Sequence, residues 1–205
     1  MNTVLTSISQ FGRILGSLFY HAPEQVQNQS LLALFQHGEW QVSCDFLSQA
    51  KREQIQHCLT QGIAQGQAQL NEDFQALFIG PNSLPAPPWG SVYLDKETVI
   101  FGSSLLELRD FMQTYHINLE LAQNEPEDHF GLMLMMAAWL AENQPEQLNE
   151  FLQQHLLTWS GRFLELLIAE QHHTFYRGLG LLSQALLDNW QQQLQLEVPK
   201  VRWYR

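Results

Sequence analysis

Residues 126–142, PEDHFGLMLMMAAWLAE, decide the fold of this chain. From Phe130 onward nearly every position is apolar, so a helix formed there is hydrophobic on most of its circumference. Such a helix is stable only where neighbouring elements cover its sides. The apolar run from Phe130 to Ala141 is also shorter than the roughly 20 residues that a membrane-spanning helix needs. The stretch therefore predicts the central buried helix of a bundle, beginning near Pro126.

Helical patterns also occupy most of the remaining sequence. Apolar residues recur there at the three- and four-residue spacing of one helical face. The predicted helical segments are 8–19, 31–35, 48–78, 104–115, 145–155, 159–171 and 175–194. Gly62 and Gly66 are candidate break points in the long 48–78 segment, and no stretch shows sustained strand-type alternation. The predicted fold class is therefore all-α, a compact helical bundle, with one domain over residues 1–205.

Composition and charge narrow the function classes. The 205 residues include 21 acidic and 10 basic side chains, which give a formal net charge of −11. This charge repels nucleic-acid phosphates and favours a cationic partner. We recognise neither a leader peptide at residues 1–20 nor a membrane segment, so we expect a cytoplasmic protein. The two cysteines, Cys44 and Cys58, are too few for a disulfide framework and predict reduced core thiols.

A proline-rich loop, GPNSLPAPPWGS at 80–91, follows the 48–78 segment. Gly80 and Pro81 end the helix, and the prolines stiffen the loop. Paired prolines beside an aromatic residue, here Trp89, are a frequent wall of a peptide-binding groove, because a stiff apolar surface loses little entropy on binding. The alternative is a loop whose Trp89 fills the core, and the usual burial of large apolar residues favours that alternative.

The second notable segment is NEPEDH at 124–129, directly before the buried helix. Asn124 and Glu127 fit a capping box for that helix. Capping does not explain Asp128 beside His129, because a carboxylate and an imidazole at the mouth of an apolar helix are suited to a charged ligand. The residues alone leave both interpretations open.

Signatures of catalysis are missing from the sequence. It contains no Gly-x-Ser-x-Gly elbow, no GxxxxGK[ST] phosphate loop, no GxGxxG after a strand and no HExxH zinc motif. Glu125, Asp128 and His129 suggest a metal site, yet neighbours in one helical turn point in different directions and no second ligand cluster has a recognisable spacing. We therefore expect no enzyme activity, no metal and no cofactor.

Several motifs together resemble a known family. They are RILGSLFY at 13–20, LFIGP at 77–81, PPWGSVYLD at 87–95 and NEPEDHFG at 124–131. In order and spacing they are similar to the TorD/DmsD family of redox enzyme maturation chaperones, and the likeness extends over nearly the whole chain. The resemblance implies an all-helical cytoplasmic chaperone that binds the twin-arginine signal peptide of a molybdoenzyme, for the most similar members dimethyl sulfoxide reductase. Such a chaperone delays export until the cofactor is loaded and the enzyme is folded.

The resemblance also implies which residues form the peptide site. The family's peptide-binding region corresponds to Phe74, Leu77, Phe78, Pro88, Trp89, Ser91, Asp128 and His129. We expect the apolar members to hold the apolar stretch of the peptide, and Asp128, helped by Glu125 or Glu127, to face its arginines. This chain departs from the family at Phe74 and Asn82, where relatives have tryptophans. Phe74 keeps an aromatic wall, whereas Asn82 replaces an apolar surface with an amide.

The expected partners are the signal peptide and, as a further candidate, the twin-arginine translocase, with the chain itself a monomer. Two alternatives come from other classes. One is a metal-dependent hydrolase that uses Glu125, Asp128 and His129, and about one bound metal ion per chain would support it. The other is a docking subunit of a redox complex, which predicts a stable complex with the mature enzyme lacking its signal peptide.

Overall fold

The structure, a computed structural model, describes residues 3–98, 100, 102–119 and 125–205. All regular secondary structure in these residues is helical, apart from one isolated bridge between Trp89 and His129. The α-helices are α1 (Thr3–Tyr20), α2 (Val26–His37), α3 (Gln49–Ala64), α4 (Gln67–Phe74), α5 (Ser91–Leu94), α6 (Ser103–Thr114), α7 (Phe130–Asn143), α8 (Pro145–Phe151), α9 (Leu157–Ala169) and α10 (Thr174–Gln193). Short 3₁₀ or π segments cover Glu39–Ser43, Gln75–Ile79 and Leu152–Leu156. The all-α prediction is confirmed.

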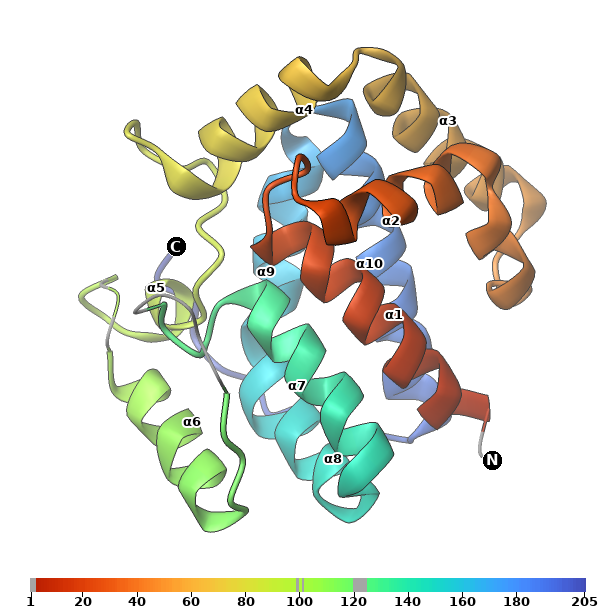
Figure 1. Cartoon of the computed structure of the whole chain (residues 1–205). Coiled ribbons are helices and arrows are strands. Elements are labelled where there is room, and N and C mark those ends of the chain that lie inside the picture. Colours follow the sequence, from red (N-terminus) through yellow and green to blue (C-terminus); the bar gives the residue numbers. More distant parts are fainter. Residues whose placement is uncertain (1–2, 99, 101, 120–124) are drawn as a thin grey trace.

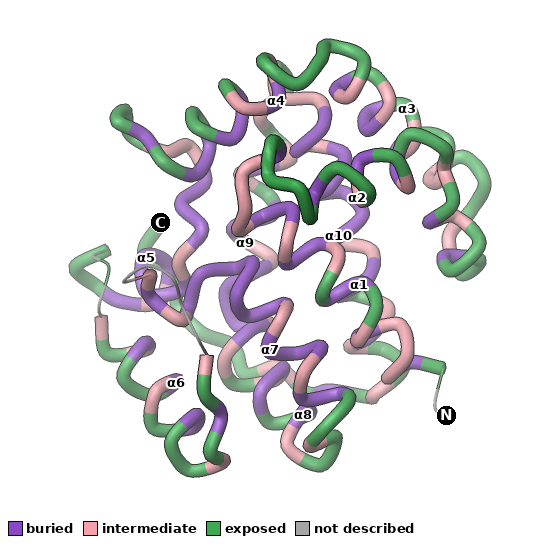
Figure 2. Tube along the Cα trace, viewed as in Figure 1, coloured by how far each residue is buried: buried purple, intermediate pink, exposed green. Residues whose placement is uncertain are grey.

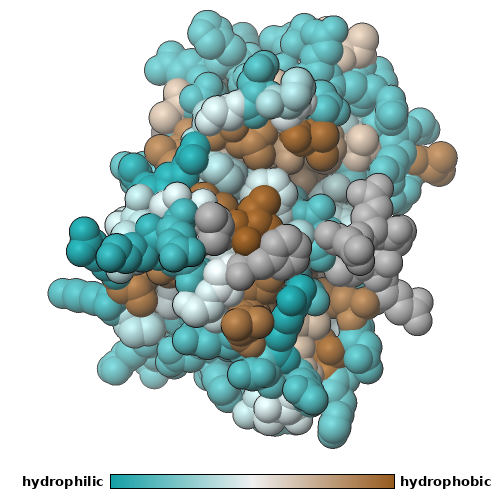
Figure 3. Space-filling view, turned by 90° about the vertical axis from the view of Figure 1, so that its left-hand side faces the viewer, coloured by the Kyte–Doolittle hydropathy of each residue, from teal (hydrophilic) through white to brown (hydrophobic). Residues whose placement is uncertain are grey.

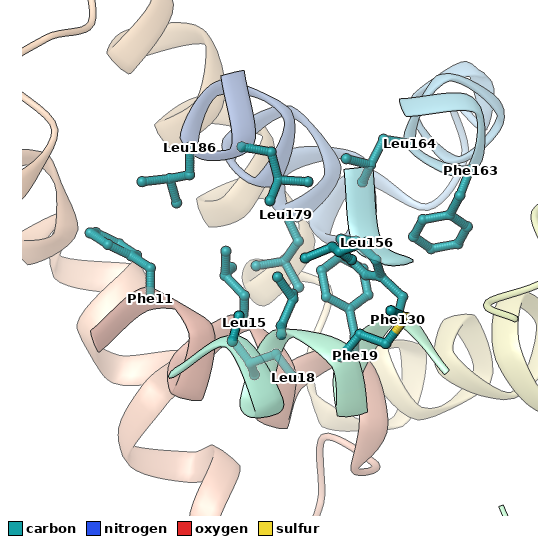
Figure 4. Close-up of a cluster of buried hydrophobic side chains, with 14 of the residues drawn as sticks. Phe11, Leu15, Leu18, Phe19, Phe130, Leu156, Phe163, Leu164, Leu179 and Leu186 are labelled. Atoms are coloured by element: carbon teal, nitrogen blue, oxygen red, sulfur yellow. The ribbon is translucent and has the colours of Figure 1, made fainter. Parts of the chain in front are cut away.

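Helix α7 occupies the centre of the bundle, as its composition predicts. Ten of its fourteen residues are buried. Helix α1 packs along α7, and α9 and α10 lie behind this pair in the view of Figure 1. Buried residues gather along these helices in Figure 2, whereas α2, α3 and α6 carry exposed outer faces. Figure 4 shows side chains of the shared core, among them Phe11, Leu15, Phe19, Phe130, Phe163, Leu164, Leu179 and Leu186.

Two glycines allow α1 and α7 to approach each other closely. A Cβ added to Gly16 would lie 2.7 Å from the carbonyl oxygen of Gly131, and one added to Gly131 would lie 2.7 Å from that of Gly16. Neither position has room for a side chain without a shift of backbone. The contact places the end of α1, with Tyr20 and His21, beside the start of α7, where the predicted site residues lie.

Helix α7 begins at Phe130, four residues after the predicted start at Pro126. Its N-cap is His129, whose Nδ1 accepts a hydrogen bond from the amide of Gly131 (3.1 Å). An unprotonated imidazole nitrogen therefore does here what a serine or aspartate oxygen does at most helix starts.

The predicted capping box is wrong for Glu127. Its carboxylate forms an ion pair with Arg109 of α6 (2.8 Å) rather than capping α7. Asn124, the other member of the predicted box, lies outside the described residues. The pairing partner comes from a distant part of the sequence, which a local pattern cannot reveal.

Other helix boundaries are partly as predicted. The 48–78 segment breaks at Gly66, whose φ of +91° is in the region that favours glycine. Gly62 is not a break: it lies inside α3, and a Cβ there would meet the backbone nitrogen of Phe175 at 2.4 Å. The predicted gap between residues 155 and 159 is also absent, because the π segment Leu152–Leu156 connects α8 to α9 without interruption.

Cys44 and Cys58 are buried and free, as predicted. Burial raises the pKa of the Cys44 thiol to about 12, so this thiol is not a nucleophile at neutral pH. Within the described ranges, no helix has both the length and the apolar character needed to span a bilayer. One hydrophobic cluster extends from Val4 to Leu196, and the single domain over 1–205 stays a prediction.

Candidate functional site

The proline-rich loop and the turn before α7 lie against each other. The amide of Phe130 donates to the carbonyl of Pro88 (2.7 Å), and the amide of Gly90 donates to the carbonyl of Asp128 (3.1 Å). The side chain of Asp128 accepts a third hydrogen bond through Oδ2, from the amide of Ser91 (2.7 Å). The two segments that the sequence singled out separately therefore form one structural unit.

A pocket of about 200 Å³ opens between this unit, the end of α1 and the end of α4. Its described lining combines aromatic rings with titratable groups and contains neither lysine nor arginine. The lining residues are Tyr20, His21, Gln25, Phe74, Phe78, Ile79, Trp89, Glu125 and His129. Five of the nine predicted site residues are among them, namely Phe74, Phe78, Trp89, Glu125 and His129.

Phe74 and Phe78 supply the apolar floor of the pocket. They come from the end of α4 and the π segment that follows it, and their ring centroids lie 5.5 Å apart. Both rings also pack on Tyr176 of α10, which fixes them from behind. Ile79 stands at the rim and is 60% exposed, a high value for a large apolar side chain. Figure 3 shows separate hydrophobic patches among hydrophilic residues on the face that carries α5 and α6.

Glu125 is the carboxylate that lines the pocket. Its Oε1 accepts a hydrogen bond from the indole Nε1 of Trp89 (2.5 Å). Burial raises the pKa of the Glu125 carboxyl, an effect that the bond from Trp89 opposes. The neighbouring Tyr20 hydroxyl has a raised pKa because it is desolvated and faces this carboxylate. Glu125 is half-buried, which leaves its carboxylate open to a cationic ligand.

His129 lies deeper in the same wall. It is 5% exposed and its ring contacts those of Tyr20 and Trp89, with centroids 5.4 and 6.1 Å away. Burial, with a smaller contribution from His21, lowers the pKa of the His129 imidazole to about 3. The ring is therefore neutral at physiological pH, which agrees with its role as the acceptor that caps α7.

Asp128 lies behind the pocket rather than in its lining. It is 4% exposed, and within the described part of the chain its Oδ1 has no hydrogen-bond partner. Burial raises the pKa of this carboxyl, and the bonds from Ser91 oppose the rise. In this structure Asp128 holds the loop in place, and Glu125 rather than Asp128 faces the pocket.

Leu77, Pro88 and Ser91 are buried in the same way. Leu77 is fully buried in the core, the carbonyl of Pro88 accepts from the amide of Phe130, and the amide of Ser91 donates to the side chain of Asp128. The predicted site thus divides into two groups. Five residues line the pocket, and the other four, including Asp128, hold the elements that form it.

Four lining residues were missed from the sequence: Tyr20, His21, Gln25 and Ile79. Ile79 lies in the family motif at 77–81, and Tyr20 ends the family motif at 13–20. The sequence therefore drew attention to the segments that contain both residues. The signal that the motif at 13–20 belongs to the site is the Gly16–Gly131 approach, which only the structure shows.

Glu125, Asp128 and His129 do not converge on one point. Each is bonded to a different group: the Trp89 indole, the Ser91 amide and the Gly131 amide. Across the residues that the structure describes, no three His, Cys, Asp or Glu side chains are grouped as metal ligands. This geometry does not favour the hydrolase alternative.

Comparisons with known proteins agree on one family. The model described as nitrate reductase delta subunit matches residues 45–165. The "Probable Tat proofreading chaperone DmsD" of Haemophilus influenzae is 47% identical over 209 residues and covers 100% of both chains. The Tat proofreading chaperone DmsD of Salmonella paratyphi A is 42% identical over 187 residues, 91% of this chain and 90% of its own.

A solved structure is similar in fold. It is described as a redox enzyme maturation protein from Archaeoglobus fulgidus, and it matches with a TM-score of 0.53 at 22% identity. The match covers 83% of this chain and 91% of that one. At this identity the likeness concerns the fold alone.

Proposed function

Since this chain belongs to the nitrate reductase delta subunit family, in the branch of the Tat proofreading chaperones named DmsD, we propose that it binds the twin-arginine signal peptide of a redox enzyme and delays its export. The observation that carries the proposal is the pocket in which Glu125 stands beside an aromatic floor. A twin-arginine signal has a basic end followed by an apolar stretch. Its receptor therefore needs a carboxylate next to an apolar surface.

The lining residues divide the recognition between them. Phe74, Phe78 and Trp89 accept apolar side chains of the peptide, and Ile79 extends this surface at the rim. Glu125 pairs with an arginine, replacing or sharing its bond from the Trp89 indole. The net charge of −11 adds a long-range attraction for the basic end.

The size of the pocket limits what it holds. At about 200 Å³ it is smaller than the roughly 300–1,000 Å³ typical of pockets that enclose a whole ligand. It accommodates one or two anchoring side chains, and the rest of the peptide lies along the surface. Micromolar binding needs about 8 kcal/mol, which a few buried anchors and one charged contact supply. Such an affinity also permits release.

Finer parts of the proposal concern the cellular role. The client is a molybdoenzyme subunit, with dimethyl sulfoxide reductase as the first candidate, and the protein acts in the cytoplasm before export. It works as a monomer without enzyme activity, and the twin-arginine translocase is a further candidate partner. The relatives that carry chaperone names support a role other than catalysis.

A docking subunit of a redox complex is the second candidate function. The family model is described as a reductase subunit, which supports this alternative. The four DmsD relatives compared, at 42–47% identity and each matching 91% or more of this chain, carry chaperone names, which favours the chaperone. A binding assay with a mature reductase that lacks its signal peptide would separate the two functions. A docking subunit would form a stable complex with this enzyme, whereas a chaperone that recognises the signal peptide would not.

The experiment is a calorimetric titration with a synthetic twin-arginine peptide of a molybdoenzyme. The same peptide with both arginines changed to glutamine is the matched control. We expect saturable binding that weakens when the arginines are removed. Equal binding of both peptides would refute the proposed pairing of Glu125 with an arginine. A lack of binding to several candidate signal peptides would refute the proposed function.

A further inference from the structure

Residues 199–205, here called the strap, begin six residues after α10 and end at the side of α5, where the C-terminus lies in Figure 1. Two hydrogen bonds attach the strap to α9. The indole Nε1 of Trp203 donates to the carbonyl of Thr158 (2.8 Å), and Nε of Arg162 donates to the carbonyl of Arg205 (3.1 Å). Because the strap forms no helix, it has no hydrogen-bond ladder of its own, and its bonds to other elements fix its position.

Two further hydrogen bonds connect the strap to the proline-rich loop and the helix that follows it. The amide of Tyr204 donates to the carbonyl of Tyr93 in α5 (2.9 Å). Nη2 of Arg205 donates to the carbonyl of Leu84 (2.6 Å). Among the described residues, only one other hydrogen bond reaches a polar group of residues 81–87, from the Tyr93 hydroxyl to the carbonyl of Pro87 (2.8 Å).

Tyr93 transmits the position of the strap to the loop. Its ring stacks on Trp159 of α9, with centroids 5.6 Å apart and planes at 19°, while its hydroxyl holds Pro87. Gly90 packs so closely on the same indole that an added Cβ would lie 2.7 Å from Nε1 of Trp159. Trp89 lies between Pro87 and Gly90 in the sequence and lines the peptide pocket.

We propose that the strap is a positioning element for the peptide site: Tyr204 and Arg205 set the place of Trp89 in the pocket and thereby its affinity for a twin-arginine peptide. This inference rests on the proposed function. The turn and start of α7 bond the loop at residues 88–91, and the strap bonds it at Leu84 and bonds α5 at Tyr93. With the strap detached, residues 81–87 keep a single hydrogen bond, so the loop spends part of its time away from the binding position. Affinity falls in proportion to the competent fraction.

The strap carries a positive charge, whereas the protein as a whole has a negative net charge. Lys200, Arg202 and Arg205 make it basic in a protein of net charge −11. Removal of one positive charge leaves the protein more attractive to a cationic peptide. Any weakening caused by Arg205→Ala is therefore opposite in direction to the electrostatic effect. Lys200 is exposed and its side chain makes no hydrogen bond to the described residues, so Lys200→Ala is a matched charge control.

The test compares Arg205→Ala, Tyr204→Pro, which removes the donating amide, and Lys200→Ala in the full chain. Calorimetry with the twin-arginine peptide measures affinity, and hydrogen exchange of loop amides 82–90 measures loop mobility without peptide. For each of the first two variants we expect a loss of affinity of about two- to tenfold, the usual effect of one hydrogen bond, and faster loop exchange. Lys200→Ala should bind as tightly as the unaltered protein or slightly tighter, and Arg205→Lys, which retains a donor, should recover part of the affinity.

A purely structural role of the strap would lower the melting temperature and leave the affinity of the folded protein unchanged. That outcome, or unchanged affinity and loop exchange in both strap variants, overturns the inference. If the unaltered protein binds no twin-arginine peptide, the proposed function fails and this inference fails with it. If the unaltered protein binds and the strap variants bind equally well, only the strap is refuted.

Discussion

Replacement of His129 by asparagine should make the fold less sensitive to acid. In the folded protein the imidazole pKa is about 3, against 6.5 in the unfolded chain. Between these values the unfolded chain binds a proton that the folded protein does not, so the free energy of unfolding falls as the pH drops below 6.5. Protonation would also convert Nδ1 from an acceptor to a donor and remove the cap on the Gly131 amide.

The size of the effect follows from the pKa difference. Each pH unit between the two pKa values costs about 1.4 kcal/mol for one proton, so acidification from about pH 7 to about pH 5 should cost about 2 kcal/mol through His129 alone. Asparagine does not titrate, and its side-chain oxygen is a good N-cap acceptor. The variant starts less stable at neutral pH, because it loses ring contacts with Tyr20 and Trp89. The difference between the two proteins should shrink by about 2 kcal/mol towards pH 5.

Urea unfolding followed by circular dichroism at several pH values measures this difference directly. The other groups with shifted pKa values, such as Glu125 and Asp128, are present in both proteins and largely cancel in the comparison. A difference that stays constant between about pH 7 and pH 5 would show that His129 titrates normally in the folded state. The reasoning from burial to a neutral cap would then be refuted.

The remaining predictions concern the pocket and the packing of the helices. Glu125→Gln keeps a hydrogen-bond acceptor for the indole but removes the charge, so calorimetry should show about 10- to 100-fold weaker binding of the twin-arginine peptide and little change for its diglutamine control; equal losses for both peptides would contradict the ion pair. Leu77→Ala should lower the free energy of unfolding by about 2–5 kcal/mol. Ile79→Ala should change it by less than about 0.5 kcal/mol and still weaken peptide binding; normal binding would exclude Ile79 from the surface that contacts the peptide. Gly161→Ala, with open space around its Cβ, should raise the melting temperature, whereas Gly62→Ala, which collides with backbone, should lower it; the reverse order would show that the helix contacts are placed wrongly.

Much of the fold was predictable because its signals are local. The apolar run after Phe130 identified the central helix, and the glycine at Gly66 identified a real break. The errors have non-local or irregular causes. Glu127, in the turn before α7, has its partner Arg109 in α6, 18 residues earlier in the chain. The π segment Leu152–Leu156 has more residues per turn than a 3.6-residue period detects.

The sequence predicted which two segments form the site. It did not predict which of their residues line the pocket and which hold the loop in place. Glu125 and Asp128 are three residues apart, both are acidic, and both belong to the same motif, so sequence offers no means of separating them. The structure separates them because the turn before α7 directs Glu125 to the Trp89 indole at the pocket and Asp128 to the Ser91 amide behind it. Loss of either carboxylate should weaken peptide binding, for different reasons: one removes a contact with the ligand, and the other releases the loop that carries Trp89. A motif in which every residue is needed for binding can therefore contain few residues that touch the peptide. A substitution that preserves the hydrogen bond and removes the charge distinguishes a residue that contacts the peptide from one that holds the loop.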